Sequence, residues 1–313
     1  MVNIAVLGAT GQIGRGLASE LAASGEQELL LYARDIDRLQ AFIDAQGIRR
    51  HVRARDIKHF GQDECDVVIN CIGACDPAKV QQIGGEIISL TEEYDNSALA
   101  YLTARPATTY IFLSSGAVYG TKFEQPATED SRVYYEVNRQ DAVSLYGLAK
   151  MYAETKHRVL ANFNIVDLRI FGYFSRYIDL DGRSFMAQLC SALVHGEVFF
   201  TEPGDMVRDY VIPADFANLI RCCIERRSLN DAFDVYSAAP VRKFELIEYL
   251  AECTNLRYEV RTNLERDDAT GIKTHYYTEH QRSRKIGYRP KFTAVEGIRH
   301  ELDALVRNYR AEA

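Results

Sequence analysis

Three features that the sequence lacks exclude whole classes of protein. No apolar run in its 313 residues approaches the roughly 20 residues that a membrane-spanning helix needs, so we expect no membrane partner. The first residues, Met1 to Gly8, carry no basic leader, which predicts no signal peptide and a cytoplasmic location. There is also no excess of basic residues, because 37 Lys and Arg face 44 Asp and Glu for a formal net charge of −7. That balance argues against nucleic acid as a partner.

The cysteines lack the spacing of a zinc or redox site. The seven cysteines include no Cys-x-x-Cys pair; Cys71 and Cys75 are separated by three residues, and Cys222 and Cys223 are adjacent. The seven histidines are scattered along the chain. We therefore expect reduced cysteines in a cytosolic protein and no metal site.

In the first half of the chain, short apolar segments alternate with longer helical patterns. The predicted strands are residues 4–7, 28–33, 51–55, 66–70, 110–114 and 164–170. Helical patterns at 14–23 and 37–45 separate the first three strands. Strands that return after each helix imply right-handed crossovers and a parallel sheet covered on both faces. The predicted fold class is therefore α/β, with a doubly wound parallel sheet of the Rossmann type.

The pattern changes after about residue 171, where aromatic and charged residues mix. We predict helices at 243–253 and 295–309, and a further strand at 233–236. The expected organisation is a dinucleotide-binding domain over residues 1–170 plus about 211–240, interleaved with a smaller substrate-binding lobe over about 171–210 plus 241–313.

A glycine-rich turn follows the first predicted strand and opens the first predicted helix. Gly8 permits a tight turn, Gly11 lets the backbone approach a pyrophosphate, and Gly14 lets the helix pack closely on the strand. In this strand–turn–helix context the pattern predicts a dinucleotide site. Its predicted cofactor-binding residues are Gly8, Thr10, Gly11, Gln12, Ile13 and Gly14.

The end of the second predicted strand bears on the choice of dinucleotide. An acidic residue there would bind the ribose hydroxyls of NAD, whereas an arginine would pair with the 2′-phosphate of NADP. Arg34 comes first and Asp35 follows. We therefore predict NADP with Arg34 as a cofactor contact, while a shift of one residue in the turn would favour NAD.

Two further motifs carry catalytic chemistry. Tyr146 and Lys150 are spaced by four residues, so on a helix they lie on one face, where a lysine favours the phenolate form of a tyrosine. Ser115 follows the fifth predicted strand, at the sheet edge where ligands of doubly wound folds bind. We predict that Ser115 holds the reacting oxygen while Tyr146 exchanges its proton and Lys150 contacts the nicotinamide ribose.

The combination of Gly-x-x-Gly-x-x-Gly, Ser-Ser-x-x-Val-Tyr-Gly at 114–120 and Tyr-x-x-x-Lys resembles the extended short-chain dehydrogenase/reductase family. The resemblance is to its NAD-dependent epimerase/dehydratase branch, which acts on nucleotide sugars, and it covers nearly the whole chain. It implies that Arg208, in Arg-Asp-Tyr, contacts the substrate diphosphate, and that Lys273 contacts a phosphate. Asn96 stands where the family usually has an asparagine in the helix that follows. The cofactor contacts that the resemblance implies are Asp56 and Ile57 beside the adenine, Cys71, Ile72 and Gly73 along the cofactor, Phe171, Tyr146 and Lys150.

The sequence departs from that family at two positions. The sugar-nucleotide 4,6-dehydratases carry an Asp-Glu pair after the catalytic Ser or Thr, where this chain has Gly116 and Ala117. Without that acid–base pair we reject dehydration. Many epimerases have an asparagine after the sixth strand, where this chain has Gly172.

The predicted function is an NADPH-dependent reductase of a nucleotide-diphosphate sugar, acting at C4 of a 4-keto-6-deoxyhexose, for which polysaccharide biosynthesis would be a fitting context. The first alternative is a nucleotide-sugar 4-epimerase with tightly bound NAD. An alternative of another class is a non-catalytic NADP-binding regulatory protein. The apolar character of the Tyr146 helix, together with the family resemblance, predicts a homodimer.

Overall fold

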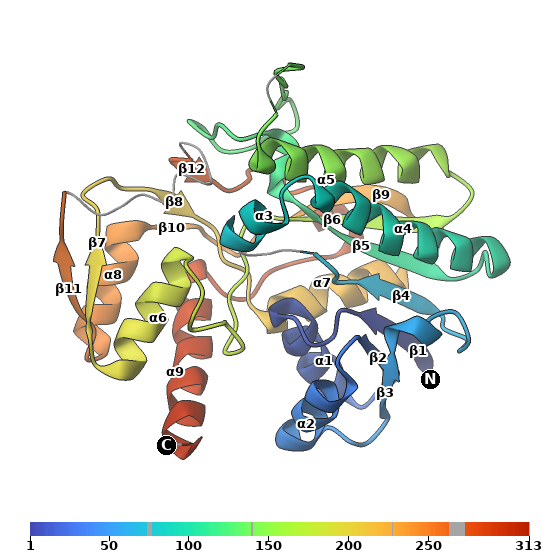
Figure 1. The fold of residues 1–313 in the computed structure, drawn as a ribbon, viewed down its shortest axis with the longest axis horizontal. Coiled ribbons are helices and arrows are strands. Elements are labelled where there is room, and N and C mark those ends of the chain that lie inside the picture. Colours follow the sequence, from blue (N-terminus) through green and yellow to red (C-terminus); the bar gives the residue numbers. More distant parts are fainter. Residues whose placement is uncertain (74–76, 139, 227, 263–272, 313) are drawn as a thin grey trace.

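The computed structural model describes residues 1–73, 77–138, 140–226, 228–262 and 273–312 (Figure 1). It confirms the predicted doubly wound α/β fold, with seven parallel strands in the order β3-β2-β1-β4-β5-β6-β9. The strands are β1 (Val2–Leu7), β2 (Gln27–Ala33), β3 (Val52–Asp56), β4 (Val67–Asn70), β5 (Thr109–Ser115), β6 (Asn164–Ile170) and β9 (Asn230–Val235).

Successive strand residues point to opposite sides of the sheet. Because both sides carry apolar residues, helices cover both faces. Ile4 and Val6 of β1 belong to one apolar core, and Ala5 and Leu7 belong to the other. The first core is closed by α1 (Gln12–Ser24), α2 (Ile36–Gln46) and α7 (Pro213–Glu225). The second is closed by α4 (Glu86–Ala104) and α5 (Ala142–Val159), and α3 (Pro77–Ile83) packs on α5. Each fully buried leucine contributes about 1.5–3 kcal/mol to such cores.

Other segments of the second half of the chain form a smaller lobe with its own apolar core, seen on the left of Figure 1. Two small sheets, β10-β8-β12 and β11-β7, accompany its helices. The elements of this lobe are α6 (Phe185–His195), β7 (Val198–Thr201), β8 (Val207–Arg208), β10 (Val241–Arg242), α8 (Lys243–Cys253), β11 (Arg257–Val260), β12 (His275–Tyr276) and α9 (Ala294–Glu312). Short 3₁₀ helices complete the chain: η1 (Ile57–His59), η2 (Gly116–Tyr119) and η3 (Arg282–Ile286).

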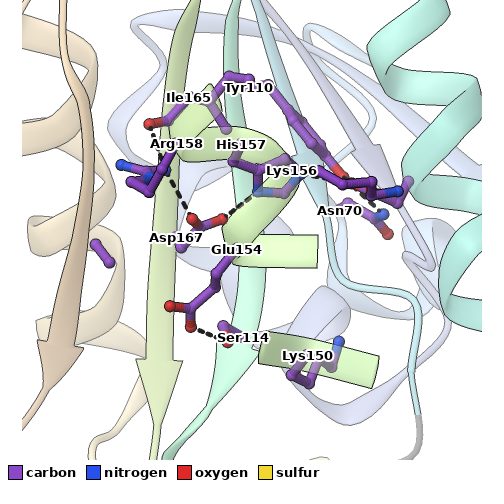
Figure 2. A network of polar contacts seen from close by, with 12 residues as sticks. Asn70, Tyr110, Ser114, Lys150, Glu154, Lys156, His157, Arg158, Ile165 and Asp167 are labelled. Atoms are coloured by element: carbon purple, nitrogen blue, oxygen red, sulfur yellow. Dashed lines mark hydrogen bonds and ion pairs between the residues drawn. The ribbon is translucent and has the colours of Figure 1, made fainter. Parts of the chain in front are cut away.

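A buried histidine ties α4, α5 and β6 together. His157 of α5 contacts Asp167 of β6 through Nδ1 at 2.6 Å and Asp95 of α4 through Nε2 at 2.8 Å, and all three side chains are 0% exposed (Figure 2). Both carboxylates can only accept, so an imidazolium that donates from both ring nitrogens satisfies the pair. Burial lowers the pKa of His157, but the hydrogen bonds and charges of Asp167 and Asp95 outweigh burial and raise it to about 9.

This network reaches the end of β4. The hydroxyl of Tyr110 donates to Asp95 at 3.0 Å, and Asn70 Nδ2 donates to that hydroxyl at 3.1 Å. Asn70 Oδ1 in turn accepts from the backbone N–H of Ile72 at 3.0 Å. These hydrogen bonds therefore fix the position of helix α5 relative to the turn after β4.

The sequence predicts no membrane-spanning helix, no disulfide and no metal site, and the described part of the chain bears on each of these predictions. Its helices include none that is long and apolar enough to cross a membrane. None of its cysteines is in a disulfide, while Cys75 lies outside the described residues. The described residues contain no group of three His, Cys, Asp or Glu that could hold a metal ion.

Candidate active site

A central cavity of about 440 Å³ opens at the edge of the sheet where β1, β4, β5 and β6 end. Parallel strands all end at one edge, so the turns that follow them converge there. The cavity brings together eleven of the predicted residues: Gln12, Ile13, Cys71, Ile72, Gly73, Ser115, Tyr146, Lys150, Phe171, Arg208 and Lys273. The predicted residues that do not line it are Gly8, Thr10, Gly11, Gly14, Arg34, Asp56 and Ile57.

The glycine-rich turn has the geometry of a cofactor cradle. Gly8 has a φ angle of +78°, a backbone conformation that residues with a side chain rarely adopt. A Cβ on Gly14 would lie 2.4 Å from the carbonyl oxygen of Gly8, so only glycine permits this approach of α1 to β1. The helix begins at Gln12, two residues before the predicted start, which places Gly11 at its N-terminus.

The N-terminus of α1 fits an anionic group. Gly11 offers no side-chain cap, and the first turn of α1 contains no acidic residue. The free N–H groups and the positive end of the helix dipole favour a phosphate there. Gln12 Nε2 is buried without a hydrogen-bond partner among the described residues, and Gln12 lines the central cavity. These groups fit the pyrophosphate of a dinucleotide.

The two charged residues that follow β2, Arg34 and Asp35, have different surroundings. Asp35 Oδ1 accepts from the backbone N–H of Arg38 at 2.9 Å and caps α2, whereas Arg34 is exposed at the end of the strand. Asp56 caps η1 at the end of β3 through Lys58 N at 2.9 Å, and Ile57 packs on the second core. The structure thus places Asp56 and Ile57 beside β2, outside the central cavity.

The three predicted catalytic side chains lie on β5 and α5. Ser115 ends β5, and its Oγ accepts from the backbone N–H of Ala117 at 3.2 Å. Lys150 is 2% exposed, and its ammonium donates to the carbonyl of Leu113 at 2.8 Å. It also lies 5.9 Å from the ring centroid of Tyr146, one turn earlier on α5 (Figure 2 shows Lys150 on its helix). The hydrogen bond to β5 fixes the lysine within the cavity wall.

The structure leaves little room for a side chain at the two positions where the sequence departs from the family pattern. A Cβ on Gly116 would lie 2.6 Å from Cδ1 of Phe171, whose ring is buried and lines the cavity. A Cβ on Gly172 would lie 2.3 Å from the backbone oxygen of Asp209. Neither an aspartate at 116 nor an asparagine at 172 fits without movement of these neighbours.

Basic residues from the smaller lobe also line the cavity. Arg208 of β8 is half-buried, and burial lowers its pKa. Burial and the nearby charge of Arg208 lower the pKa of Lys273 to about 8. Among the described lining residues, Lys150, Arg183, Arg208 and Lys273 are basic and none is acidic. A cavity of this charge suits an anionic ligand.

Sequence reasoning missed some of the lining residues. Tyr276, Arg183, Tyr210 and Met186 also line the cavity. Tyr210 belongs to the Arg-Asp-Tyr motif of Arg208, whereas no motif marks Arg183 or Met186. Asn96 is exposed, and its Oδ1 accepts from Lys156 at 2.9 Å, so it lies outside the cavity.

Comparisons with solved structures confirm the fold. A UDP-glucose-4-epimerase from Stenotrophomonas maltophila, with bound NAD and formylated UDP-arabinopyranose, matches with a TM-score of 0.81 and 17% identity over 100% of both chains. A UDP-glucose 4-epimerase from Thermotoga maritima with UDP-glucose matches with a TM-score of 0.80 and 17% identity over 98% of this chain and 99% of that one. A dTDP-glucose 4,6-dehydratase from Bacillus anthracis in complex with NAD gives 0.78 and 14% identity over 99% and 98%.

Sequence comparison gives the family. A dTDP-4-dehydro-6-deoxyglucose reductase from Escherichia coli is 24% identical over 213 residues, which span 64% of this chain and 61% of that protein. Residues 4–239 match the family described as NAD dependent epimerase/dehydratase, which is more than half of the chain. The protein is therefore an enzyme of the NAD dependent epimerase/dehydratase family.

Proposed function

We propose that this enzyme is an NADPH-dependent reductase of a nucleotide-activated 4-keto-6-deoxyhexose. The observation that carries the proposal is that Ser115, Tyr146 and Lys150 line the same cavity as Arg208 and Lys273. The first three can polarise and protonate a carbonyl oxygen, and the last two can bind a diphosphate. The similarity to the Escherichia coli reductase supports the same reaction class.

The reaction requires one hydride and one proton for each carbonyl. The glycine-rich turn, the N-terminus of α1 and Lys150 would hold the dinucleotide, which when bound supplies the hydride to C4. Tyr146 donates its phenolic proton to the carbonyl oxygen, so the C=O double bond becomes a C–O single bond, with a new C–H bond from the hydride and a new O–H bond from the tyrosine. Lys150 stabilises the tyrosinate that remains until solvent restores the proton. Ser115 hydrogen-bonds the carbonyl oxygen and holds it toward Tyr146.

The surroundings of Ser115 support reduction over dehydration. Elimination of water from C5 and C6 needs an acid and a base next to the catalytic Ser or Thr, and this chain has Gly116 and Ala117 there. The ring of Phe171 occupies the space that a side chain at 116 would need. Reduction needs no further acid–base pair beyond Tyr146.

The end of β2 supports NADP as the preferred cofactor. The carboxylate of Asp35 is engaged as the cap of α2, and the guanidinium of Arg34 is exposed where the adenosine ribose of a dinucleotide would lie. A planar guanidinium suits a 2′-phosphate.

The test is a cofactor stoichiometry with dTDP-4-keto-6-deoxyglucose. We expect one NADPH oxidised per sugar reduced, measured by loss of nicotinamide absorbance at 340 nm. Tyr146→Phe should abolish turnover, whereas Tyr152→Phe, on an exposed part of the same helix, should leave it unchanged. Absence of NADPH oxidation with this substrate and with its UDP and GDP counterparts would contradict the proposal.

A 4-epimerase is the second candidate, supported by the fold similarity to epimerases that bind NAD. It would use the same residues to oxidise and then reduce C4, so NAD would remain bound to the purified protein and UDP-galactose would be converted to UDP-glucose without NADPH. A non-catalytic NADP-binding role, the third candidate, predicts that Tyr146→Phe has no effect in either assay.

We further propose a homodimer formed through α4 and α5. Tyr152 and Val159 of α5 are 51% and 79% exposed, although both are large and apolar. They lie two turns apart on α5, which packs on α4. Light scattering should give twice the chain mass, and the double variant Tyr152→Glu, Val159→Glu should give the monomer mass.

A further inference from the structure

Residues 173–178, which come shortly after β6, lie between the two lobes, and we call them the linking segment. Tyr173 and Tyr177 pack on the first core, which α1 and α2 close. Phe174 and Ile178 pack on the core of the smaller lobe instead. Ile178 also lines the central cavity. The linking segment therefore belongs both to the join between the lobes and to the wall of the cavity.

Tyr177 is inserted between α1 and α2. Its hydroxyl lies 2.8 Å from Ser19 Oγ of α1 and donates to Gln46 Oε1 of α2 at 2.7 Å. A phenol has a single proton, so Ser19 is the donor in the first of these two hydrogen bonds. The ring packs edge-on against that of Phe42 of α2, with centroids 5.6 Å apart, and only 9% of Tyr177 is exposed. This one side chain thus ties the linking segment to both helices.

The first turns of α1 contact the linking segment directly. Arg15 Nη2 donates to the backbone oxygen of Tyr177 at 2.8 Å, and its guanidinium lies 5.3 Å from the centroid of the Tyr177 ring. That distance is within the range of a cation–π interaction. A Cβ on Gly16 would lie 2.2 Å from the hydroxyl oxygen of Tyr173, so this second tyrosine also reaches α1. The linking segment therefore lies against the part of α1 that follows the glycine-rich turn.

The residue before Tyr177 is bound to the smaller lobe. Arg176 donates to the carboxylate of Glu301 on α9 from its backbone N–H at 2.9 Å and from its guanidinium at 2.9 and 2.7 Å. Glu301 is 1% exposed, and the bidentate pair fixes the orientation of both side chains. Adjacent residues are thus held by opposite lobes, which leaves the linking segment little freedom to shift at this point.

The anchored Tyr177 determines where the next residue lies. Ile178 lines the central cavity together with Gln12 and Ile13, which begin α1. The N-terminus of that helix is where the pyrophosphate of a dinucleotide fits. A wall residue that is already held in place binds a ligand without the entropic cost of ordering it. Without the Tyr177 anchor, this part of the wall would have to be ordered each time a dinucleotide binds.

We propose that Tyr177 is a positioning residue for the dinucleotide: its hydrogen bonds to α1 and α2 hold Ile178 in the cavity wall and thereby slow the release of the bound cofactor. Tyr177 acts through Ile178, since it does not itself line the central cavity. The inference rests on the part of the proposed function that places the dinucleotide at the glycine-rich turn. It applies to NADPH and NADH alike, and it does not depend on the sugar or on its reduction.

The first test measures cofactor release without any sugar. Enzyme loaded with NADPH is mixed with excess NADP⁺ in a stopped-flow instrument, and the change in nicotinamide fluorescence gives the dissociation rate; NADH and NAD⁺ are used in the same way. Tyr177→Phe keeps the ring and the backbone contact to Arg15 but loses both hydroxyl hydrogen bonds. We expect release about tenfold faster, with the association rate changed less than about threefold. A release rate equal to that of wild type for both cofactors would overturn the proposal.

Two controls separate this role from a general loosening of the fold. Tyr134→Phe, at a residue that is 86% exposed, should leave the release rate unchanged. The Kd of dTDP or UDP, which the proposed function places at Arg208 and Lys273, should stay within about twofold of wild type in Tyr177→Phe by calorimetry. Equal weakening of the nucleotide diphosphate and the cofactor would show that the whole cavity is loosened, and would also overturn the proposal.

The second test acts on the same hydrogen bond from outside the cavity. Gln46 is exposed at the last residue of α2 and does not line the central cavity. Gln46→Ala should speed release about threefold in wild type but less than about 1.5-fold in Tyr177→Phe, where the shared hydrogen bond is already absent. Gln46→Glu keeps an acceptor for the Tyr177 hydroxyl and should retain the wild-type rate. Equal acceleration by Gln46→Ala in both backgrounds would show that Tyr177 does not control release. If no keto-sugar is reduced, the proposed function fails, and the release rates still decide the role of Tyr177.

Discussion

Replacement of His157 tests how the buried network sustains the fold around the site. Raising a histidine pKa from 6.5 in an unfolded chain to about 9 in the folded protein contributes about 3 kcal/mol to stability. Because the folded pKa is the higher one, this contribution is complete below pH 6.5 and is lost as pH rises through 9. We therefore expect the contribution of His157 to the free energy of unfolding, taken as the difference between wild type and a variant without this histidine, to fall by about 3 kcal/mol between pH 6.5 and pH 9.5.

His157→Gln removes the titrating group and leaves Asp95 and Asp167 buried. Each carboxylate keeps a cationic partner, because Lys156 Nζ lies 2.7 Å from Asp95 and Arg158 Nη2 lies 2.7 Å from Asp167. The expected loss at pH 6.5 is therefore about 3 kcal/mol, the lower end of the range for a broken buried ion pair. The variant should also lack the decline of stability above pH 7.

The assay is urea unfolding at fixed protein concentration and at pH 6.5, 7.5, 8.5 and 9.5, followed by circular dichroism. His59→Gln serves as the control, because His59 is exposed and should change stability by less than about 0.5 kcal/mol. If wild type and His157→Gln show parallel stability curves over this pH range, His157 is not held as an imidazolium and the reasoning is refuted.

Three further outcomes are expected. Gly116→Ala should lower the free energy of unfolding by about 1–3 kcal/mol, and Phe171→Leu in the same chain should recover part of it, as measured by urea unfolding. Gly172→Asn should cost at least as much, because its Cβ meets the backbone of Asp209. Since the pKa of Lys273 is about 8 and a bound diphosphate would raise it, dTDP should bind about tenfold more weakly at pH 9 than at pH 7 by calorimetry. Lys273→Met should bind dTDP weakly and without this pH dependence.

The strands and the glycine-rich turn could be predicted because their signals are local. Ile4 to Leu7 are buried on both faces of a parallel sheet and therefore read as a continuous apolar run. Gly8 and Gly14 follow at the spacing that a tight turn and a close helix contact require. Ser115 and Tyr146 could be predicted for the same reason, because each belongs to a motif in or next to a recognisable strand or helix.

The contacts that complete the site join segments far apart in the sequence. The two-residue strands β8 and β12 pair Arg208 with Tyr276, and strands this short have no periodicity to detect. The network of Asp95, His157 and Asp167 likewise joins two helices and a strand, so no one segment contains the pattern. Propensity within a segment carries no information about such pairings.

Gly116 and Phe171 show why the reaction class is easier to read than the substrate. The absence of an acid at 116 is visible in the sequence, and the proposal of reduction over dehydration rests on it. What replaces the missing side chain is the ring of Phe171, which arrives from the end of β6 and contacts Tyr276 from the smaller lobe. The shape of the cavity wall that would face the proposed substrate is thus set by residues from three separate segments, each of which depends on the packing of the others. The chemistry follows from motifs, whereas specificity follows from this packing, so substitutions at Phe171 and Tyr276 should alter substrate preference before they alter the type of reaction.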